Sequence, residues 1–485
     1  MEKAISIAEG EGLTSSICRH ITDKEKLADY INKFGTQKQE IKVAPLYIYL
    51  ISILYLLFGI ENFMLAINLF NLFLFISMLF ILYWYLLHNY PNNKLLHIGT
   101  LLIFGINSMM LELSYGAHME TLSLFLFVIV FIYHLWIVAN DNQAWYKLFF
   151  YSVTLTLLFL SKYSAIPFVG AFIIHFLFLK RYRQFLFISI LVLIGTGFWF
   201  ILRDIFMDGR VISSFGLFPF SNNAPKIIAI PSFFTLIYKL SLVIKLFLSM
   251  FIGFYGLAYL FLFAIVYLIN YKSRNDVQLN FIILAVTIAF YFVLCFKPSF
   301  GALSDYRYLF PIVVFLIPFS FIELEKYISK IKRTMGRTIV YVLIGFFTFF
   351  HLIDIVKFTY NTKKKSIDRT SIFLAAEELI KEEKISNDKN ILTNIIGYSV
   401  YADMGVVWAP GNISYENKVT LIDMYKIDYV LFCENQKNHL ASWDQNVVPQ
   451  DIFTDLQLIC ISKKDNRVKL YSTKKIEGMA NEFLE

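Results

Sequence analysis

The most constraining feature of this sequence is a series of long apolar blocks that carry almost no charge. Because their apolar residues run continuously instead of forming the one-sided stripe of a soluble helix, most of the chain must have lipid as its solvent. A charged fraction of 16% beside 58% hydrophobic residues excludes a soluble globular enzyme. We therefore expect a polytopic α-helical membrane protein with about ten spans, at residues 62–87, 96–111, 119–139, 147–161, 164–180, 184–202, 249–270, 279–296, 308–323 and 339–356.

Two further apolar stretches are weaker candidates for spans. Residues 44–59 are interrupted by Pro45, and residues 233–248 carry Lys239 and Lys245. We expect both to lie along the membrane interface as amphipathic helices. This assignment leaves an even number of spans, so both termini share one side of the membrane.

The basic residues of the short loops indicate which side that is. Counted in alternate loops, one set carries twelve lysines and arginines and the other set carries six. The positive-inside rule places the richer set in the cytoplasm, which puts both termini outside it. One cluster after the last span gives the contrary signal: Lys357, Lys363, Lys364, Lys365 and Arg369.

Polar segments flank the apolar part, residues 44–357, which we interpret as the transmembrane domain. Residues 1–43 contain no apolar run able to act as a signal or a span, so they are interpreted as a first extracytoplasmic loop that lacks an upstream span. Residues 358–485 are soluble in character and are predicted to form an extracytoplasmic α/β domain. Its helical patterns lie at Ile372–Leu379 and 416–426, and its β-rich runs at 390–393, 406–408, 429–433, 457–462 and 468–471.

Several kinds of partner are not indicated. The net charge of +8 resides mainly in loop residues that set orientation, so a nucleic-acid partner is not expected. The four cysteines show no C-x-x-C spacing, and His134, His175 and His351 lie within spans at no ligand spacing, so no metal site is predicted. No glycine-rich phosphate loop occurs, and no cofactor is predicted.

Ionisable residues at the ends of spans gather on the predicted outer face. They are Glu112, His118 and Glu120 before the third span, Lys162 between the fourth and fifth, and Asp305 with Arg307 before the ninth. Taken singly, each side chain is explained as well by reaching to the membrane interface as by a role in a functional site. Their convergence favours a functional site, because charge near lipid is costly.

Five short motifs in these regions resemble one known family. They are Ala44-Pro45-Leu46-Tyr47 with Leu57-Phe58-Gly59, then Gly116 to Thr121, then Leu160-Ser161-Lys162-Tyr163-Ser164, then Trp199 to Asp204, and last Asp305-Tyr306-Arg307-Tyr308-Leu309-Phe310-Pro311. In this order they resemble the motifs of the dolichyl-phosphate-mannose protein mannosyltransferase and aminoarabinose transferase family, which are membrane glycosyltransferases of the GT-C class (glycosyltransferase family 39-like).

The resemblance implies transfer of a sugar from a polyprenyl-phosphate carrier to a protein, glycolipid or glycan acceptor at the outer face of the cytoplasmic membrane, by single displacement. Glu2 or Glu120 would then take the proton of the acceptor hydroxyl, help that is worth roughly 10² to 10⁴ in rate. The leaving phosphate gathers negative charge, which a cation in a partly dry site stabilises. Arg307, Lys162 and Tyr308 are assigned to that phosphate, with Asp305, His118 and Tyr163 in support.

Two departures from the family pattern affect the acidic residues. The family carries an acidic pair after a first span, and here only Glu2 stands near that position. The second acidic position, usually aspartate, is Glu120, whose side chain is one methylene longer.

Two other classes of protein compete with the glycosyltransferase. A transporter or flippase of lipid-linked glycans would also be aromatic and basic inside, although such proteins usually show internal repeats and helix-breaking pairs in two halves, which are not found here. A catalytically inactive membrane anchor gains weight if Glu2 is truly the first acidic residue.

Overall fold

The computed structural model describes two groups of residues. In the apolar part they are chiefly 44–106, 118–140, 144–206, 258–271, 274–294 and 310–331. In the C-terminal part they are 371–386, 389–393, 405–408, 426–433 and 456–473. In the rest of the chain the structure describes some isolated positions and two short strands, β1 (Thr14–Ser15) and β2 (Lys38–Gln39). The chain divides into two compact units, one of Ile41–Phe358 and one of Met1–Glu40 with Thr359–Glu485.

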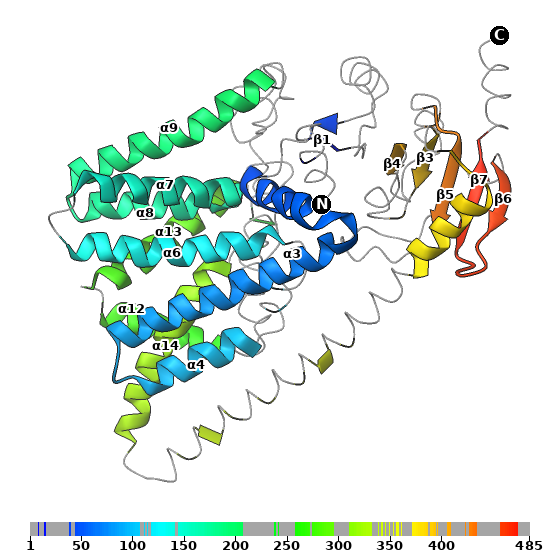
Figure 1. Ribbon diagram of the computed structural model, residues 1–485. Coiled ribbons are helices and arrows are strands. Elements are labelled where there is room, and N and C mark those ends of the chain that lie inside the picture. Colours follow the sequence, from blue (N-terminus) through cyan, green and yellow to red (C-terminus); the bar gives the residue numbers. More distant parts are fainter. Residues whose placement is uncertain are drawn as a thin grey trace. The chain divides into compact units, whose positions relative to one another are not determined.

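The first unit is helical (Figure 1). Its described helices are α3 (Pro45–Asn89), α4 (Lys94–Ile106), α6 (Met119–Ala139), α7 (Trp145–Ser161), the 3-10 turn η1 (Tyr163–Ala165), α8 (Ile166–Phe178), α9 (Tyr182–Phe206), α12 (Ala258–Asn270), α13 (Asn275–Leu294) and α14 (Phe310–Lys330). Helix α6 packs against α3 and α7, α8 against α13, and α14 against α12 and α4. Residues at the start of α6, in the turn after α7 and at the start of α14 line one pocket.

Helix α3 is two helices joined at a glycine. Pro45 lies in its first turn, where the missing N–H is not needed. Gly59 has φ 68° and ψ 173°, a conformation that side chains other than glycine rarely adopt. The residues before Gly59 therefore form a separate segment, as the sequence suggested, and Asn62–Asn89 forms a long apolar helix.

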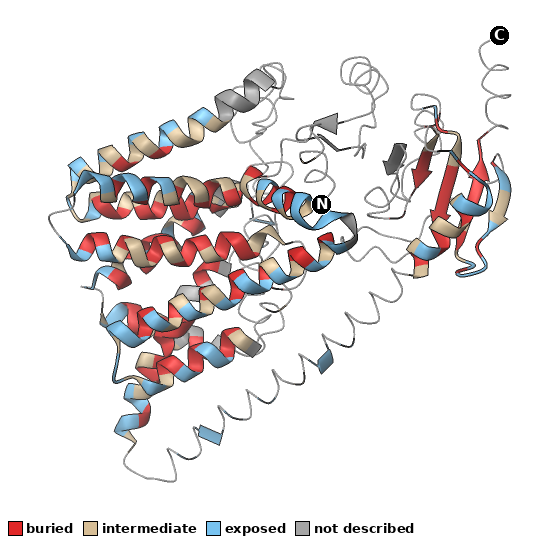
Figure 2. Cartoon of the chain, in the orientation of Figure 1, coloured by how far each residue is buried: buried red, intermediate tan, exposed pale blue. Residues whose placement is uncertain are grey.

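Three described helices are long and apolar enough to cross a membrane by length and composition: Asn62–Asn89, Met119–Ala139 and Tyr182–Trp199. Helix α9 leaves large apolar side chains without protein cover, with Leu193 69% and Phe198 61% exposed. The outward faces of several helices in Figure 2 are likewise exposed, and their apolar side chains fit lipid better than water. The expected number of about ten spans remains a prediction.

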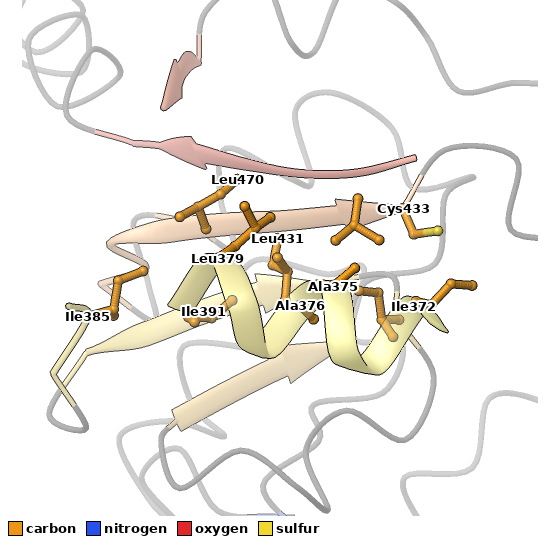
Figure 3. Close-up of a cluster of buried hydrophobic side chains, with 11 residues drawn as sticks. Ile372, Ala375, Ala376, Leu379, Ile385, Ile391, Leu431, Cys433 and Leu470 are labelled. Carbon is orange, nitrogen blue, oxygen red and sulfur yellow. The ribbon is translucent and has the colours of Figure 1, made fainter. Parts of the chain in front are cut away.

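The C-terminal unit contains a mixed five-stranded sheet with strand order β4-β3-β5-β7-β6. The strands are β3 (Asn390–Thr393), β4 (Gly405–Trp408), β5 (Tyr429–Cys433), β6 (Gln457–Ile461) and β7 (Val468–Ser472). β3 pairs in parallel with β4 and β5, and β7 pairs antiparallel with β5 and β6. Figure 3 shows a helix over residues 371–382 that packs Ala376 and Leu379 onto Ile391, Leu431 and Leu470 of the sheet.

The structure matches many expected elements closely. Helix α6 has the predicted bounds of 119–139, and β3 and β5 have the predicted bounds of 390–393 and 429–433. The predicted helix at 416–426, the interfacial stretch at 233–248 and the last span at 339–356 lie mostly outside the described residues.

Candidate functional site

The described part of the site is centred on an ion pair between Glu120 and Lys162. Lys162 Nζ lies 3.0 Å from Glu120 Oε1 and donates a hydrogen bond to it. Only 14% of the Glu120 side chain and 11% of the Lys162 side chain are exposed. Removing two charges from water is costly, so a pair of this kind is weak evidence for stability and a reasonable indicator of function.

Helix ends place both side chains. Glu120 lies in the first turn of α6, where free backbone N–H groups favour a carboxylate. Lys162 interrupts the helical path between α7 and η1, with extended backbone angles of φ −160° and ψ 119°. Because the chain turns at Lys162, the ammonium group reaches across to the beginning of α6.

A small pocket lies beside the ion pair. Its lining residues come from α6, the turn after α7, α8 and α14, and they are Glu120, Ser123, Leu124, Lys162, Ser164, Ala165, Phe168 and Pro311. Pro311 lies four residues after Arg307 in the sequence. The pocket therefore joins three of the chain regions in which the sequence placed candidate residues.

Aromatic side chains fix the residue that follows Lys162. Trp199 Nε1 donates a hydrogen bond of 3.1 Å to the hydroxyl of Tyr163, and Tyr49 contacts Trp199 edge to face with ring centroids 6.3 Å apart. Phe159 packs against the Tyr163 ring at 5.4 Å. Tyr163 thus holds the turn that carries Lys162.

A second polar pair near Glu120 was not anticipated from the sequence. Asn71 Nδ2 donates a hydrogen bond of 2.9 Å to the hydroxyl of Tyr47, and these residues are 0% and 3% exposed. The Glu120 carboxylate acts electrostatically on the Tyr47 hydroxyl, which brings this pair into the same neighbourhood. Asn71 is a polar residue inside the apolar block 62–87, and this position was the sequence signal that could have identified it as a candidate.

The other candidate residues are placed as follows. His118 is the half-buried N-cap residue of α6; its carbonyl accepts a hydrogen bond from the Thr121 N–H, and it is not one of the pocket-lining residues. The remaining ones lie outside the described residues, and they are Glu2, Glu112, Asp305, Arg307 and Tyr308.

Two of the three histidines that the sequence analysis named within spans, His134 and His175, form a buried cluster away from the pocket, and His351 lies outside the described residues. His134 Nε2 and His175 Nδ1 share a hydrogen bond of 2.8 Å, and the Tyr151 hydroxyl is hydrogen-bonded to His134 Nδ1 at 2.6 Å. Sequence spacing gave no sign of this contact, because the residues come from three different helices. Within the described parts of the chain, no group of three or more His, Cys, Asp or Glu residues could hold a metal ion.

Comparison with known proteins gives one kind of match. No family model matches the sequence, and no curated protein matches it by sequence. The fold is similar to that of ArnT from Cupriavidus metallidurans in the apo state, with a TM-score of 0.56 at 9% identity over 94% of both chains. It is also similar to the same protein bound to undecaprenyl phosphate, with a TM-score of 0.54 at 10% identity and 94% coverage of both chains. The chain therefore has a fold like that of ArnT, and at this identity the likeness concerns the fold alone.

Proposed function

We propose that this chain transfers a sugar from a polyprenyl-phosphate carrier to an acceptor at the outer face of the membrane. One observation carries the proposal: a largely buried carboxylate–ammonium pair beside a pocket, in a fold that ArnT shares along 94% of the chain. The structure of ArnT with undecaprenyl phosphate supports a lipid-linked donor for this fold.

The proposed reaction is a direct displacement at the anomeric carbon. The acceptor oxygen forms the new bond to that carbon, and its proton passes to the Glu120 carboxylate. The bond between the anomeric carbon and the phosphate oxygen breaks, and the electron pair leaves with the carrier phosphate. General-base help of this kind contributes roughly 10² to 10⁴ in rate.

Lys162 serves the phosphate in this scheme. Its ammonium group has three donors, one of which is bonded to Glu120 at 3.0 Å. A carrier phosphate bound beside it would share this ammonium, which weakens the hold on Glu120 and leaves the carboxylate more able to accept a proton. The stabilisation grows as charge develops on the departing phosphate, and this is the interaction that lowers the barrier.

Residues outside the described part complete the proposal. Arg307, four residues before the pocket residue Pro311, is proposed as a second cation for the phosphate, because its planar fork suits two phosphate oxygens. Tyr308 is proposed as a further phosphate contact, Asp305 as a support for Arg307, and Glu2 as the second acid. The soluble unit from residue 358 onward is proposed to lie outside the cytoplasm, where it could contact the acceptor.

A transfer assay in membranes tests the proposal. Membranes that contain the wild-type chain receive undecaprenyl phosphate linked to a radiolabelled sugar, and the label that moves from this carrier to a glycolipid, a glycan or a protein is measured. We expect Glu120→Gln to lower this rate by about 10²-fold or more, because the amide keeps the size but cannot accept the proton. Glu382→Gln is the matched control, since Glu382 forms an exposed ion pair with Lys463 in the C-terminal unit.

The outcomes separate the competing classes. Movement of intact, labelled lipid across the bilayer without transfer would identify a flippase. Equal transfer rates in the wild type, Glu120→Gln and Glu382→Gln would refute the assignment of Glu120 as the base.

A further inference from the structure

The turn that carries Lys162 makes polar contacts with two different helices. Helix α7 ends at Ser161 and packs against both α6 and α9. Directly after it, Lys162 Nζ lies 3.0 Å from Glu120 of α6, and the hydroxyl of Tyr163 accepts a hydrogen bond of 3.1 Å from Trp199 of α9. Two successive residues of one turn are therefore tied to two neighbouring helices.

The backbone at Lys162 links these two contacts. Lys162 has extended angles of φ −160° and ψ 119°, whereas the residues before and after it belong to α7 and η1. Along extended backbone, successive side chains point to roughly opposite sides. An anchor that holds Tyr163 against α9 therefore directs Lys162 away from α9 and toward α6, where Glu120 lies.

Aromatic rings from three elements form this anchor. Phe159, in the last turn of α7, packs against the Tyr163 ring with centroids 5.4 Å apart. The Trp199 ring on α9 is itself contacted edge to face by Tyr49, which lies in the segment of α3 before Gly59. The indole N–H of a tryptophan can donate a hydrogen bond but cannot accept one, so the tyrosine hydroxyl must be the acceptor.

A lysine side chain depends strongly on such an anchor. Its flexible four-carbon stem allows the ammonium group many positions. In the proposed reaction the Lys162 ammonium must serve both Glu120 and a phosphate, although only 11% of the side chain is exposed. A displacement of about 1 Å at a reacting centre can cost 10²-fold in rate, so the direction of the Lys162 backbone matters for transfer.

We propose that Trp199 is a positioning residue, whose indole N–H holds Tyr163 and thereby keeps the Lys162 ammonium group beside Glu120. This inference rests on the proposed function and adds to it a residue of α9 that is not among the pocket-lining residues. Trp199 acts through Tyr163 and Lys162, and it does not touch the reacting atoms.

The reactivity of the Lys162 amine tests the proposal independently of transfer. The full chain in nanodiscs is treated with formaldehyde and cyanoborohydride, and the methylation rate of each lysine is measured by mass spectrometry of its peptides. In the wild type Lys162 should react slowly, because its side chain is 11% exposed and ion-paired. Trp199→Phe keeps an aromatic ring but removes the N–H, and it should raise this rate about tenfold, the upper range for one hydrogen bond.

A double-variant cycle determines whether Trp199 acts through Tyr163. Tyr163→Phe removes the acceptor of the same hydrogen bond and should also raise the methylation rate of Lys162 about tenfold. The variant with both substitutions should show no further increase, because both remove one shared bond. Independent effects would multiply to about a hundredfold increase, and this result would overturn the inference.

Two controls separate positioning from general loosening of the bundle. Trp145→Phe changes a tryptophan at the other end of α7, where it contacts a ring of α9, and it should leave Lys162 as slow as in the wild type. Lys326, which is ion-paired on α14, is an internal reference whose rate should be the same in every variant. Faster reaction of both lysines in Trp199→Phe would indicate lost packing and would refute the positioning role.

The transfer assay relates the position of Lys162 to function. Trp199→Phe should lower the transfer rate about tenfold, and Trp145→Phe should leave it unchanged. Unchanged methylation of Lys162 in Trp199→Phe would overturn the inference whatever the transfer rate, and so would normal transfer despite faster methylation. A wild-type chain that transfers no sugar, while Lys162 methylation responds as expected, would contradict the proposed function and still support the contact between Trp199 and Tyr163 as the anchor of Lys162.

Discussion

The Glu120–Lys162 pair allows stability and chemistry to be separated in one experiment. Lys162→Met removes the ammonium group and leaves the Glu120 carboxylate with little water around it. Loss of one partner from a buried pair costs about 3–5 kcal/mol, and we expect about 3 kcal/mol here because 14% of the Glu120 side chain remains exposed. The free energy of unfolding is measured by reversible unfolding in mixed detergent micelles, followed by tryptophan fluorescence.

The double variant Lys162→Met with Glu120→Gln replaces both charges by neutral groups of similar size. Because no unpaired charge is left, its free energy of unfolding should return to within about 1 kcal/mol of the wild type. Sugar transfer should nevertheless stay at the level of the worse single variant, since the base and one phosphate contact are both missing. Recovery of transfer together with stability would show that the pair is structural and would refute the reasoning.

Three further predictions concern other parts of the molecule. Asn71→Leu should lower the free energy of unfolding by about 1–3 kcal/mol because it leaves the buried Tyr47 hydroxyl unpaired, and Tyr47→Phe added to it should recover most of this loss in the same unfolding assay. In the C-terminal unit, hydrogen bonds from Arg467 lower the pKa of Asp465 to about 2. The ionised Asp465 therefore stabilises the folded unit above about pH 4, and this contribution is lost as the pH falls toward 2. Hydrogen exchange of β7 should accelerate between these pH values, and less steeply in Asp465→Asn. Asp276 accepts hydrogen bonds from the Arg274 guanidinium and from the hydroxyl of Tyr90, at the far end of α3 from Tyr47. Asp276→Ala should therefore lower the free energy of unfolding by about 2–3 kcal/mol and leave the Kd of undecaprenyl phosphate unchanged.

Much of the fold could be predicted because the apolar blocks are bounded by clear signals. Helix α6 begins directly after His118 and ends at Ala139, before Asn140, so its composition alone fixes both ends. Strands β3 and β5 are short apolar runs between polar residues, and their predicted bounds are confirmed. The sequence placed the apolar stretch 44–59 apart from the next block, and the backbone angles of Gly59 give the physical reason.

The sequence predicted which regions of the chain contribute to the candidate site, but it did not predict which side chains contact each other. Loop alternation placed Glu120 and Lys162 on one face, although nothing in the sequence shows that residues 42 positions apart are joined at 3.0 Å. The pairs Tyr47–Asn71 and His134–His175 were missed because each depends on how separate helices pack. Periodicity reports which residues are apolar, and only tertiary packing decides which polar residues meet.

A structure of the chain bound to an undecaprenyl-phosphate sugar tests the central claim most directly. We expect the phosphate oxygens within hydrogen-bond distance of Lys162 Nζ, at about 2.7–3.2 Å. The anomeric carbon should lie where an acceptor hydroxyl can reach Glu120. A donor whose phosphate lies outside the Glu120–Lys162 pocket, with the ion pair intact and no access to either residue, would contradict the claim.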